Sequence, residues 1–192
     1  MYKRQVYVFK SVPSVLNRLW KQEAYIKASN TRPQAEYNVD IIGYYVNYPQ
    51  NFGATVALSA DGSMLAVSAP GERSKAAGVN GDQSDHSMPQ AGAVYTYTRT
   101  NNGDATPATW AHQAYIKASN PAASAQFGAS LAMAADGRTL AVGAWGERSA
   151  STGINGDATD TSLPSAGAAY VFSLNGSGQW SQQAYVKASA PG

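Results

Sequence analysis

The sequence 180-WSQQAYVKAS-189 repeats a phrase that the chain has already used twice. Residues 110–120 read WAHQAYIKASN, and residues 20–30 read WKQEAYIKASN. Wording that recurs at long intervals marks an architectural unit, because stacked units bury a hydrophobic face that one unit alone cannot bury. Within the phrase, Gln, Tyr and Lys alternate with Ala and Ile or Val, which predicts one β-strand in each unit.

Outside the phrase, two units can be aligned from residue 52 onward with a constant offset of 75 positions. The matched segments are Phe52-Gly53 with Phe127-Gly128, Asp61-Gly62 with Asp136-Gly137, Gly71-Glu72-Arg73-Ser74 with Gly146-Glu147-Arg148-Ser149, Asn80-Gly81-Asp82 with Asn155-Gly156-Asp157, and Ala91-Gly92-Ala93 with Ala166-Gly167-Ala168. Each unit reads as four strands, and the Asp-Gly pairs predict tight hairpin turns with positive φ.

The second strand of each unit, residues 64–69 or 139–144, has Leu and Val on one side and Ala, Ser or Gly on the other. This pattern predicts a strand buried on both faces. The third strand is the Tyr/Val/Phe segment at 93–97 or 168–172, and the Trp phrase is the fourth. Four-stranded units of this kind indicate an all-β fold of β-propeller blades, each a four-stranded antiparallel sheet. We favour it over a string of separate β-domains, because one such unit carries few large residues for a core of its own.

The repeats divide the chain into an incomplete propeller of about two and a half blades, whereas a closed propeller needs roughly four to eight. We expect residues 1–30 to form the last two strands of a blade, with 1–5 truncated or non-native. Residues 31–117 and 118–188 then form full blades, and residues 189–192 begin a linker to a missing blade. The insertion at 31–50 could be a long loop, an extra hairpin or a damaged stretch.

Composition excludes several classes of function. The chain carries a formal net charge of +2, and its Lys and Arg residues are scattered singly, so nucleic acid is not an expected partner. Cysteine is absent, which removes disulfides and thiolate chemistry. No run approaches the roughly 18 apolar residues of a membrane span. No N-terminal secretion signal is visible. Because we expect residues 1–5 to be truncated or non-native, this absence does not indicate the cytoplasm.

Two sets of oxygen-bearing residues are candidates for calcium. Asp61 and Asp136 lie in the first hairpins, but one carboxylate per loop cannot replace the hydration of the ion, so we interpret them as turn formers. Asn80, Asp82, Asp85, Asn155, Asp157 and Asp160 lie in the long connections after the second strands and could surround a hard cation. We favour the alternative that they build turns through side-chain hydrogen bonds to the backbone.

No constellation of catalytic residues stands out, and we expect the chain not to be an enzyme. His86 and His112 have no recurring Ser or Asp partner at a catalytic spacing. Glu72-Arg73 and Glu147-Arg148 recur in each unit, which favours a structural pair at the loop base over an active site. The Tyr and Trp residues could form a sugar-stacking platform, although aromatic residues at strand spacing more often form core.

The segments Phe127-Gly128-Ala129-Ser130-Leu131-Ala132, Asp136-Gly137, Leu140-Ala141-Val142-Gly143-Ala144 and Gly167-Ala168-Ala169-Tyr170-Val171-Phe172 resemble the FG-GAP repeat. That repeat builds the propellers of integrin alpha chains and of many bacterial surface or secreted proteins. The resemblance implies a propeller at the cell envelope or outside the cell.

The resemblance also implies a recognition or adhesion scaffold, with a protein or glycan ligand and the missing blades of the same protein as partners. Loops 31–50, 72–90 and 147–165 are expected at one end of the blades, and loops on a rigid scaffold carry function more often than the scaffold itself. One alternative is an accessory region of a secreted polymer-acting enzyme whose catalytic residues lie outside this chain. Another is a purely architectural repeat.

Overall fold

The computed structural model describes residues 5–13, 18–30, 50–101 and 108–191. These residues form ten strands: β1 Val6–Pro13, β2 Arg18–Ile26, β3 Val56–Leu58, β4 Met64–Ala69, β5 Ala93–Thr100, β6 Thr109–Ile116, β7 Ser130–Met133, β8 Thr139–Ala144, β9 Ala168–Leu174 and β10 Trp180–Val186. The described part of the chain contains no helix, and no helix of a length and apolarity that could cross a membrane was found there.

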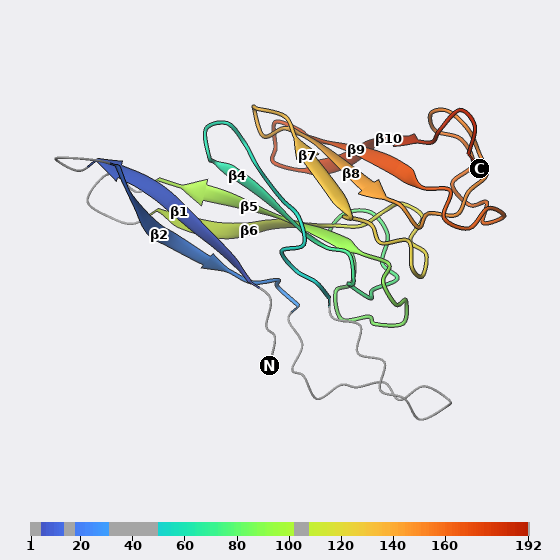
Figure 1. Ribbon diagram of the computed structural model, residues 1–192, viewed down its shortest axis with the longest axis horizontal. Helices are drawn as coiled ribbons and strands as arrows, with labels where there is room; N and C mark the ends of the chain where they lie inside the picture. Colours follow the sequence, from blue (N-terminus) through green and yellow to red (C-terminus); the bar gives the residue numbers. More distant parts are fainter. Residues whose placement is uncertain (1–4, 14–17, 31–49, 102–107, 192) are drawn as a thin grey trace, which may run out of the picture.

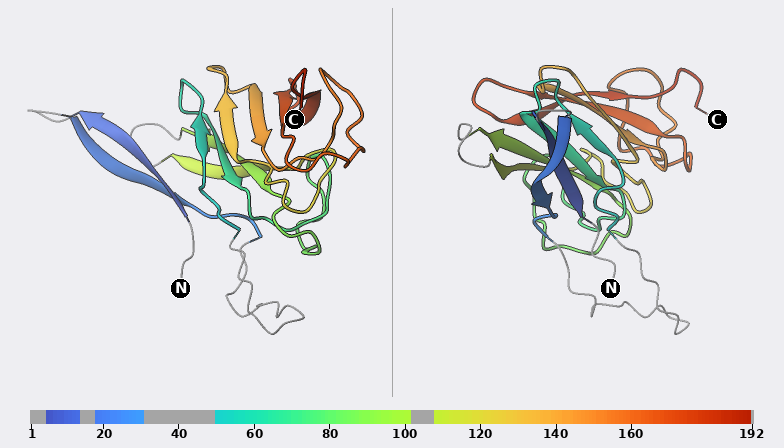
Figure 2. Two further views of the ribbon diagram at one scale, coloured as in Figure 1. Left: turned by 45° about the vertical axis from the view of Figure 1, so that its right-hand side comes forward. Right: turned by 60° about the vertical axis from the view of Figure 1, so that its left-hand side comes forward.

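The strands form three antiparallel sheets that follow one another along the chain (Figure 1). The first blade is the hairpin β1–β2, the second blade is β3-β4-β5-β6, and the third blade is β7-β8-β9-β10. Consecutive strands are neighbours in every sheet, which confirms an all-β fold of incomplete propeller blades. Figure 2 shows the hairpin on one side of the second blade and the third blade on the other.

The predicted hairpin turns are present. Gly62 has φ +69° and Gly137 has φ +70°, in the left-handed region that glycine adopts without strain. The Asp61 carboxylate accepts hydrogen bonds from Ser59 Oγ at 2.6 Å and from Ser63 N at 3.0 Å, so it closes the turn between β3 and β4.

The core lies between the blades. Residues that face each other across the first two sheets form one cluster, with Val6, Val8 and Ala24 of the hairpin against Tyr95 and its neighbours. A second cluster fills the space between the second and third blades. Each full blade inserts the Phe of its Phe-Gly pair, since Phe52 is 3% exposed and Phe127 is fully buried.

The expectation that both second strands are buried on both faces holds for β4 but is wrong for β8. Every residue of β4 is buried. In β8 Leu140, Val142 and Ala144 are buried, whereas Ala141 and Gly143 are partly exposed. The difference arises because a blade covers each face of the second sheet, while the described residues cover only one face of the third.

The phrase that begins with Trp forms β2, β6 and β10, and each copy contains a β-bulge at the same place. The register shifts at Glu23 in β2, at Gln113 in β6 and at Gln183 in β10. An extra residue at a bulge turns its side chain away from the regular alternation. Glu23 and Gln113 use that position to contact the next blade.

Candidate functional site

The two long connections, residues 70–92 after β4 and 145–167 after β8, carry most of the candidate residues. They are joined through the segment that follows β6. Asn120 Nδ2 donates to Ala158 O at 2.8 Å, and Gln126 N donates to Gln90 O at 2.9 Å. The two connections therefore lie at one end of neighbouring blades. The third predicted loop, 31–50, falls outside the described residues apart from residue 50.

Asp85 and Asp160 hold the two connections closed in the same way. Asp85 Oδ2 accepts from Lys75 N at 2.8 Å, and Asp160 Oδ2 accepts from Ala150 N at 2.7 Å, across ten residues in each case. The other carboxylate oxygen accepts a backbone bond from a serine two residues on, at 3.0 Å for Asp85 and 2.9 Å for Asp160. Each aspartate thus ties the start of its loop to the middle.

Asp82 and Asp157 form local turns. Asp82 Oδ1 accepts from Ser84 N at 2.8 Å and from its hydroxyl at 2.7 Å. Asp157 Oδ1 accepts from Thr159 N at 2.8 Å and from its hydroxyl at 2.6 Å. These are the side-chain-to-backbone turns that short polar residues favour.

Asn80 and Asn155 fasten each loop to the fourth strand of its own blade. Their φ angles are 57° and 55°, a left-handed conformation in which asparagine is over-represented. Asn80 Oδ1 accepts from Tyr115 N, and Asn155 Oδ1 accepts from Tyr185 N, both at 2.9 Å. Both asparagine side chains therefore satisfy a backbone N–H group at the edge of the fourth strand.

These hydrogen bonds favour the charged form of each aspartate. The pKa values of Asp82 and Asp157 lie below the usual value, chiefly because the hydroxyls of Ser84 and Thr159 donate to them. The pKa values of Asp85 and Asp160 are lowered chiefly by the hydrogen bonds that they accept from the backbone N–H groups of Lys75 and Ala150. Among the described residues, no three His, Cys, Asp or Glu side chains cluster where they could hold a metal. Calcium binding at these positions stays an untested alternative to the turn-building role.

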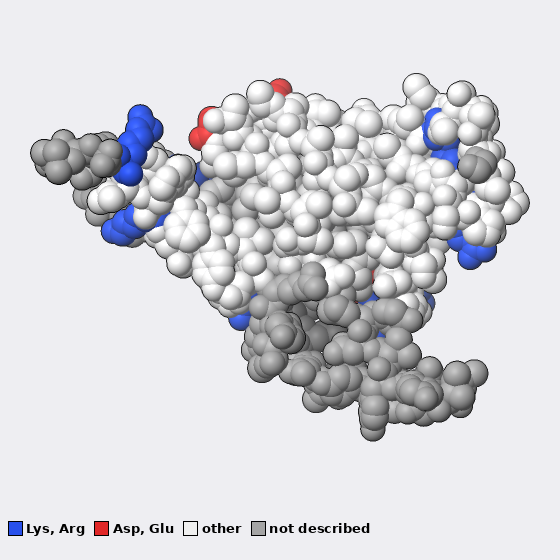
Figure 3. All heavy atoms as spheres, viewed as in Figure 1, with Lys and Arg blue, Asp and Glu red and all other residues white. Residues whose placement is uncertain are grey.

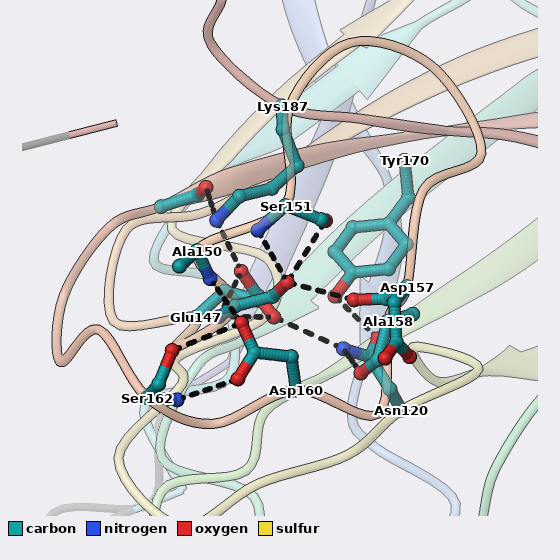
Figure 4. Close-up of polar contacts among 12 residues, drawn as sticks. Asn120, Glu147, Ala150, Ser151, Asp157, Ala158, Asp160, Ser162, Tyr170 and Lys187 are labelled. Carbon is teal, nitrogen blue, oxygen red and sulfur yellow. Dashed lines mark hydrogen bonds and ion pairs between the residues drawn. The ribbon is translucent and has the colours of Figure 1, made fainter. Parts of the chain in front are cut away.

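The centre of each loop base is a buried glutamate. Figure 4 shows the one in the third blade, Glu147. Glu72 is fully buried and pairs with Lys117 Nζ at 2.8 Å; Glu147 is 2% exposed and pairs with Lys187 Nζ at 2.6 Å. The expectation of a Glu-Arg structural pair at the loop base is corrected by these contacts. The ion-pair partner is the lysine of the Trp phrase, which folding brings from 45 or 40 residues away.

Each glutamate also binds the blade that precedes it. Asn30 Nδ2 donates to Glu72 Oε1 at 3.3 Å, and Asn120 Nδ2 donates to Glu147 Oε1 at 3.1 Å. The same asparagines accept from the hydroxyls of Tyr95 and Tyr170. Every copy of this network thus joins two successive blades to one loop base.

Burial of the network changes its acid–base properties. Burial lowers the pKa of Lys117, and the nearby Glu72 acts in the opposite direction. Burial also raises the pKa values of Tyr95 and Tyr170, with Glu72 and Glu147 adding to the effect. Each buried carboxylate is paired with a lysine and accepts further hydrogen bonds, as a charge removed from water requires.

Sequence reasoning did not find Trp145, which is 56% exposed. Its indole Nε1 donates to Gln126 Oε1 at 3.2 Å, and Gln126 lies against the end of the first long connection. Trp145, the first residue of the second connection, is therefore linked through Gln126 to the end of the first connection. One signal was available, because Trp145 occupies the position that Pro70 occupies one unit earlier.

A comparison with protein-family models matches residues 110–172 to the FG-GAP repeat. No curated protein and no solved structure matches the chain significantly. The matched residues run from the Trp of β6 to the Phe of β9, and so include the Phe-Gly pair, β7, β8 and the second long connection.

Proposed function

Because this chain is an FG-GAP repeat protein built of propeller blades, we propose that it is a non-catalytic recognition or adhesion scaffold at the cell envelope or outside the cell. FG-GAP repeats are typical of extracellular proteins. The ligand, a protein or a glycan, binds at the end that carries loops 72–90 and 147–165.

One observation carries this proposal: the two loops share a framework and differ in what they present. The residues that build the framework are the same in both copies. In the first loop they are Glu72, Ser74, Asn80, Gly81, Asp82 and Asp85, and in the second loop they are Glu147, Ser149, Asn155, Gly156, Asp157 and Asp160. Between them, the exposed Lys75 is replaced by an exposed Ala150, and the exposed Ala77 by an exposed Thr152. A fixed backbone with changing outward side chains suits recognition, since rigid loops lose little entropy on binding.

The surface charge is consistent with such a ligand. In the view of Figure 3, Lys and Arg lie mainly toward the two ends of the molecule, and the surface between them is largely uncharged. A surface of this kind offers hydrogen bonds and apolar contacts rather than a field that attracts phosphates. Trp145, exposed just before loop 147–165, supplies a flat ring of the type that binds sugar or peptide side chains.

The experiment is a binding screen of the purified chain against immobilised glycans and extracellular proteins, followed by Trp145→Ala. We expect the affinity for the ligand to fall about tenfold or more, as for an interface aromatic. Leu58→Ala is the matched control, because Leu58 is 52% exposed on β3, outside the loops. If Trp145→Ala and Lys75→Ala both bind the ligand as tightly as the unaltered chain does, the ligand lies elsewhere and the assignment to this end is overturned.

The exposed Trp145 also favours a second candidate, an accessory region that holds a polysaccharide for an attached enzyme. The two differ in the behaviour of the longest native form of the protein. Turnover of a glycan that depends on residues of loops 72–90 or 147–165 would contradict the non-catalytic scaffold. Turnover that depends only on residues outside this chain would support the second candidate.

A further inference from the structure

The first blade exposes four aromatic side chains whose counterparts in the other two blades are covered. Tyr7, Phe9, Trp20 and Tyr25 are 46%, 52%, 72% and 46% exposed. In the third blade, the residues at these positions are between 0% and 5% exposed: Tyr170, Phe172, Trp180 and Tyr185. In the second blade Tyr95, Tyr97 and Tyr115 are also buried. We call this aromatic side of a blade its front face.

What covers the front face in the third blade is the opposite side of the second blade. That side consists of small and branched residues in the same core cluster: Ala66, Val94, Ala114 and Ile116. We call this side the back face. The aromatic rings of the third blade pack closely against the small residues of the second blade, which removes both surfaces from water.

The back face of the third blade carries the same kinds of residue and is not covered by any described part of the chain. Its matching residues are all partly exposed: Ala141, Ala169, Ala184 and Val186. Ile154, which matches the partly buried Val79, is 69% exposed. One chain therefore presents an open front face at one side and an open back face at the other.

A polar contact recurs across each blade junction and is missing at the open front face. Trp110 Nε1 donates to Glu23 Oε1 at 3.1 Å, and Trp180 Nε1 donates to Gln113 Oε1 at 3.0 Å. The acceptor is in both cases the bulge residue of the preceding blade. Trp20 has no hydrogen-bond partner among the described residues.

The matching acceptor on the open back face is the bulge residue Gln183. Its side chain is exposed, and its Nε2 donates to Ser181 Oγ at 2.8 Å. Its Oε1 accepts no hydrogen bond within the described part of the chain. Trp20 and Gln183 are thus the two halves of a contact that the molecule makes twice internally.

Charge selects the same pairing. At the first junction the bulge residue is charged, and Arg99 Nε binds Glu23 Oε1 at 2.6 Å. At the second junction Gln113 is neutral, and the position of Arg99 is held by Leu174. On the hairpin that position is the neutral Ser11, beside Trp20 in the register. A neutral bulge residue such as Gln183 can therefore pack beside Ser11 and Trp20, whereas a glutamate there would be buried without a cation to pair with.

We propose that the front face of the first blade binds the back face of the third blade of a second copy of this chain, head to tail. The contact uses different surfaces on the two copies, so it is heterologous and builds rings or open filaments depending on the rotation per step. Its centre is Trp20, with its ring on the small residues of the partner's back face and its N–H on the bulge glutamine.

Analytical ultracentrifugation of the chain across a concentration series tests the proposal. We expect mass to grow with concentration, and Trp20→Asp or Ala169→Glu to weaken association at least about tenfold. Mixing the two variants restores one interface, because the first keeps its back face and the second keeps its front face. The expected product is a one-to-one dimer from two variants that are each monomeric.

Three results would overturn the proposal. A chain that stays monomeric up to about 100 µM has no such contact of useful affinity. Self-association that survives Ala169→Glu but is lost in Trp20→Asp indicates a front-to-front dimer. Mixed variants that stay monomeric also contradict a head-to-tail contact. Phe9→Ser and Ile154→Asp, at positions 52% and 69% exposed, repeat the test should either first variant lose its circular dichroism spectrum.

A second measurement isolates the polar contact. Trp20→Phe removes the indole N–H and keeps a ring, and Gln183→Ala removes its acceptor. If the two groups bond across the interface, the double variant loses less association free energy than the sum of the losses in the two single variants. Fully additive losses would remove this contact from the proposal. Ligand binding at loops 72–90 and 147–165 is read out separately, so failure of either proposal leaves the other standing.

Discussion

Gly92 and Gly167 hold the same position in successive blades, and we predict that alanine affects them very differently. Both have positive φ, +85° and +74°, so alanine costs each about 1–2 kcal/mol of backbone strain. A Cβ on Gly92 would lie 2.1 Å from Phe127 O and 2.5 Å from Phe127 N. A Cβ on Gly167 would meet nothing closer than Trp145 O at 3.6 Å.

The clash at Gly92 involves backbone of the next blade, which no side-chain rotation can relieve. Here Phe127 N donates to Ala91 O at 3.1 Å, and the Phe127 ring packs edge-on against Tyr170 at 5.3 Å between centroids. Relief requires the second and third blades to separate by about 1 Å, which costs about 1–3 kcal/mol or more in a packed core. We expect Gly92→Ala to lose about 2–5 kcal/mol and Gly167→Ala only the backbone strain of about 1–2 kcal/mol.

Urea unfolding followed by tryptophan fluorescence gives both free energies of unfolding. It should be run at low protein concentration, so that self-association adds no stability. Gly62→Ala serves as a second control, because Gly62 has φ +69° and no heavy atom within 4 Å of the added carbon. Equal losses at Gly92 and Gly167 would refute the argument that close approach between blades, rather than φ, demands glycine at position 92.

Three further predictions concern the charged groups. Lys187→Met leaves Glu147 buried without its counter-ion and should cost about 3–5 kcal/mol, and Lys187→Met with Glu147→Gln should regain part of that loss in the same urea assay. The pKa of Asp61 is lowered to about 2, first by the Ser59 hydroxyl and then by Ser63. The stabilisation by the Asp61 carboxylate is therefore complete above about pH 4 and is lost between about pH 4 and 2. Asp61→Asn should flatten the dependence of melting temperature on pH in that window, and an unchanged dependence would contradict the role of Asp61 in the turn. The loop aspartates already accept hydrogen bonds from their own loops, so we expect the same thermal melt with chelator and with added calcium, and a clear rise with calcium would instead support a metal site at Asn80, Asp82 and Asp85 or their counterparts.

The repeat was readable from the sequence because its signals are local. Strand alternation, the Asp-Gly turns and the spacing of the Trp phrase depend on neighbours along the chain, and they predicted the four strands of each full blade. They also identified Asp61 as a turn former, because a carboxylate two residues from a backbone N–H can reach it without any help from the rest of the fold.

The loop base could not be read in this way. Glu72 was interpreted through its neighbour Arg73, but its ion pair is with Lys117, and nothing local links residues 45 positions apart. The exposure of Trp145 was equally hidden, since an aromatic residue after a strand is consistent with core or surface until the neighbouring blade is placed.

The sequence by itself determined the kind of protein: all-β, repeated, with a Trp phrase as the fourth strand of every blade. Its periodicity carried that information because strands and turns follow from local backbone preferences. Only the tertiary structure decided what the phrase does. In the second and third copies its Trp reaches back to the bulge of the preceding blade, and its Lys pairs with a buried glutamate of its own blade. In two copies its last Asn reaches forward to the next blade. These contacts depend on the stacking of sheets, which brings together residues that no local pattern connects.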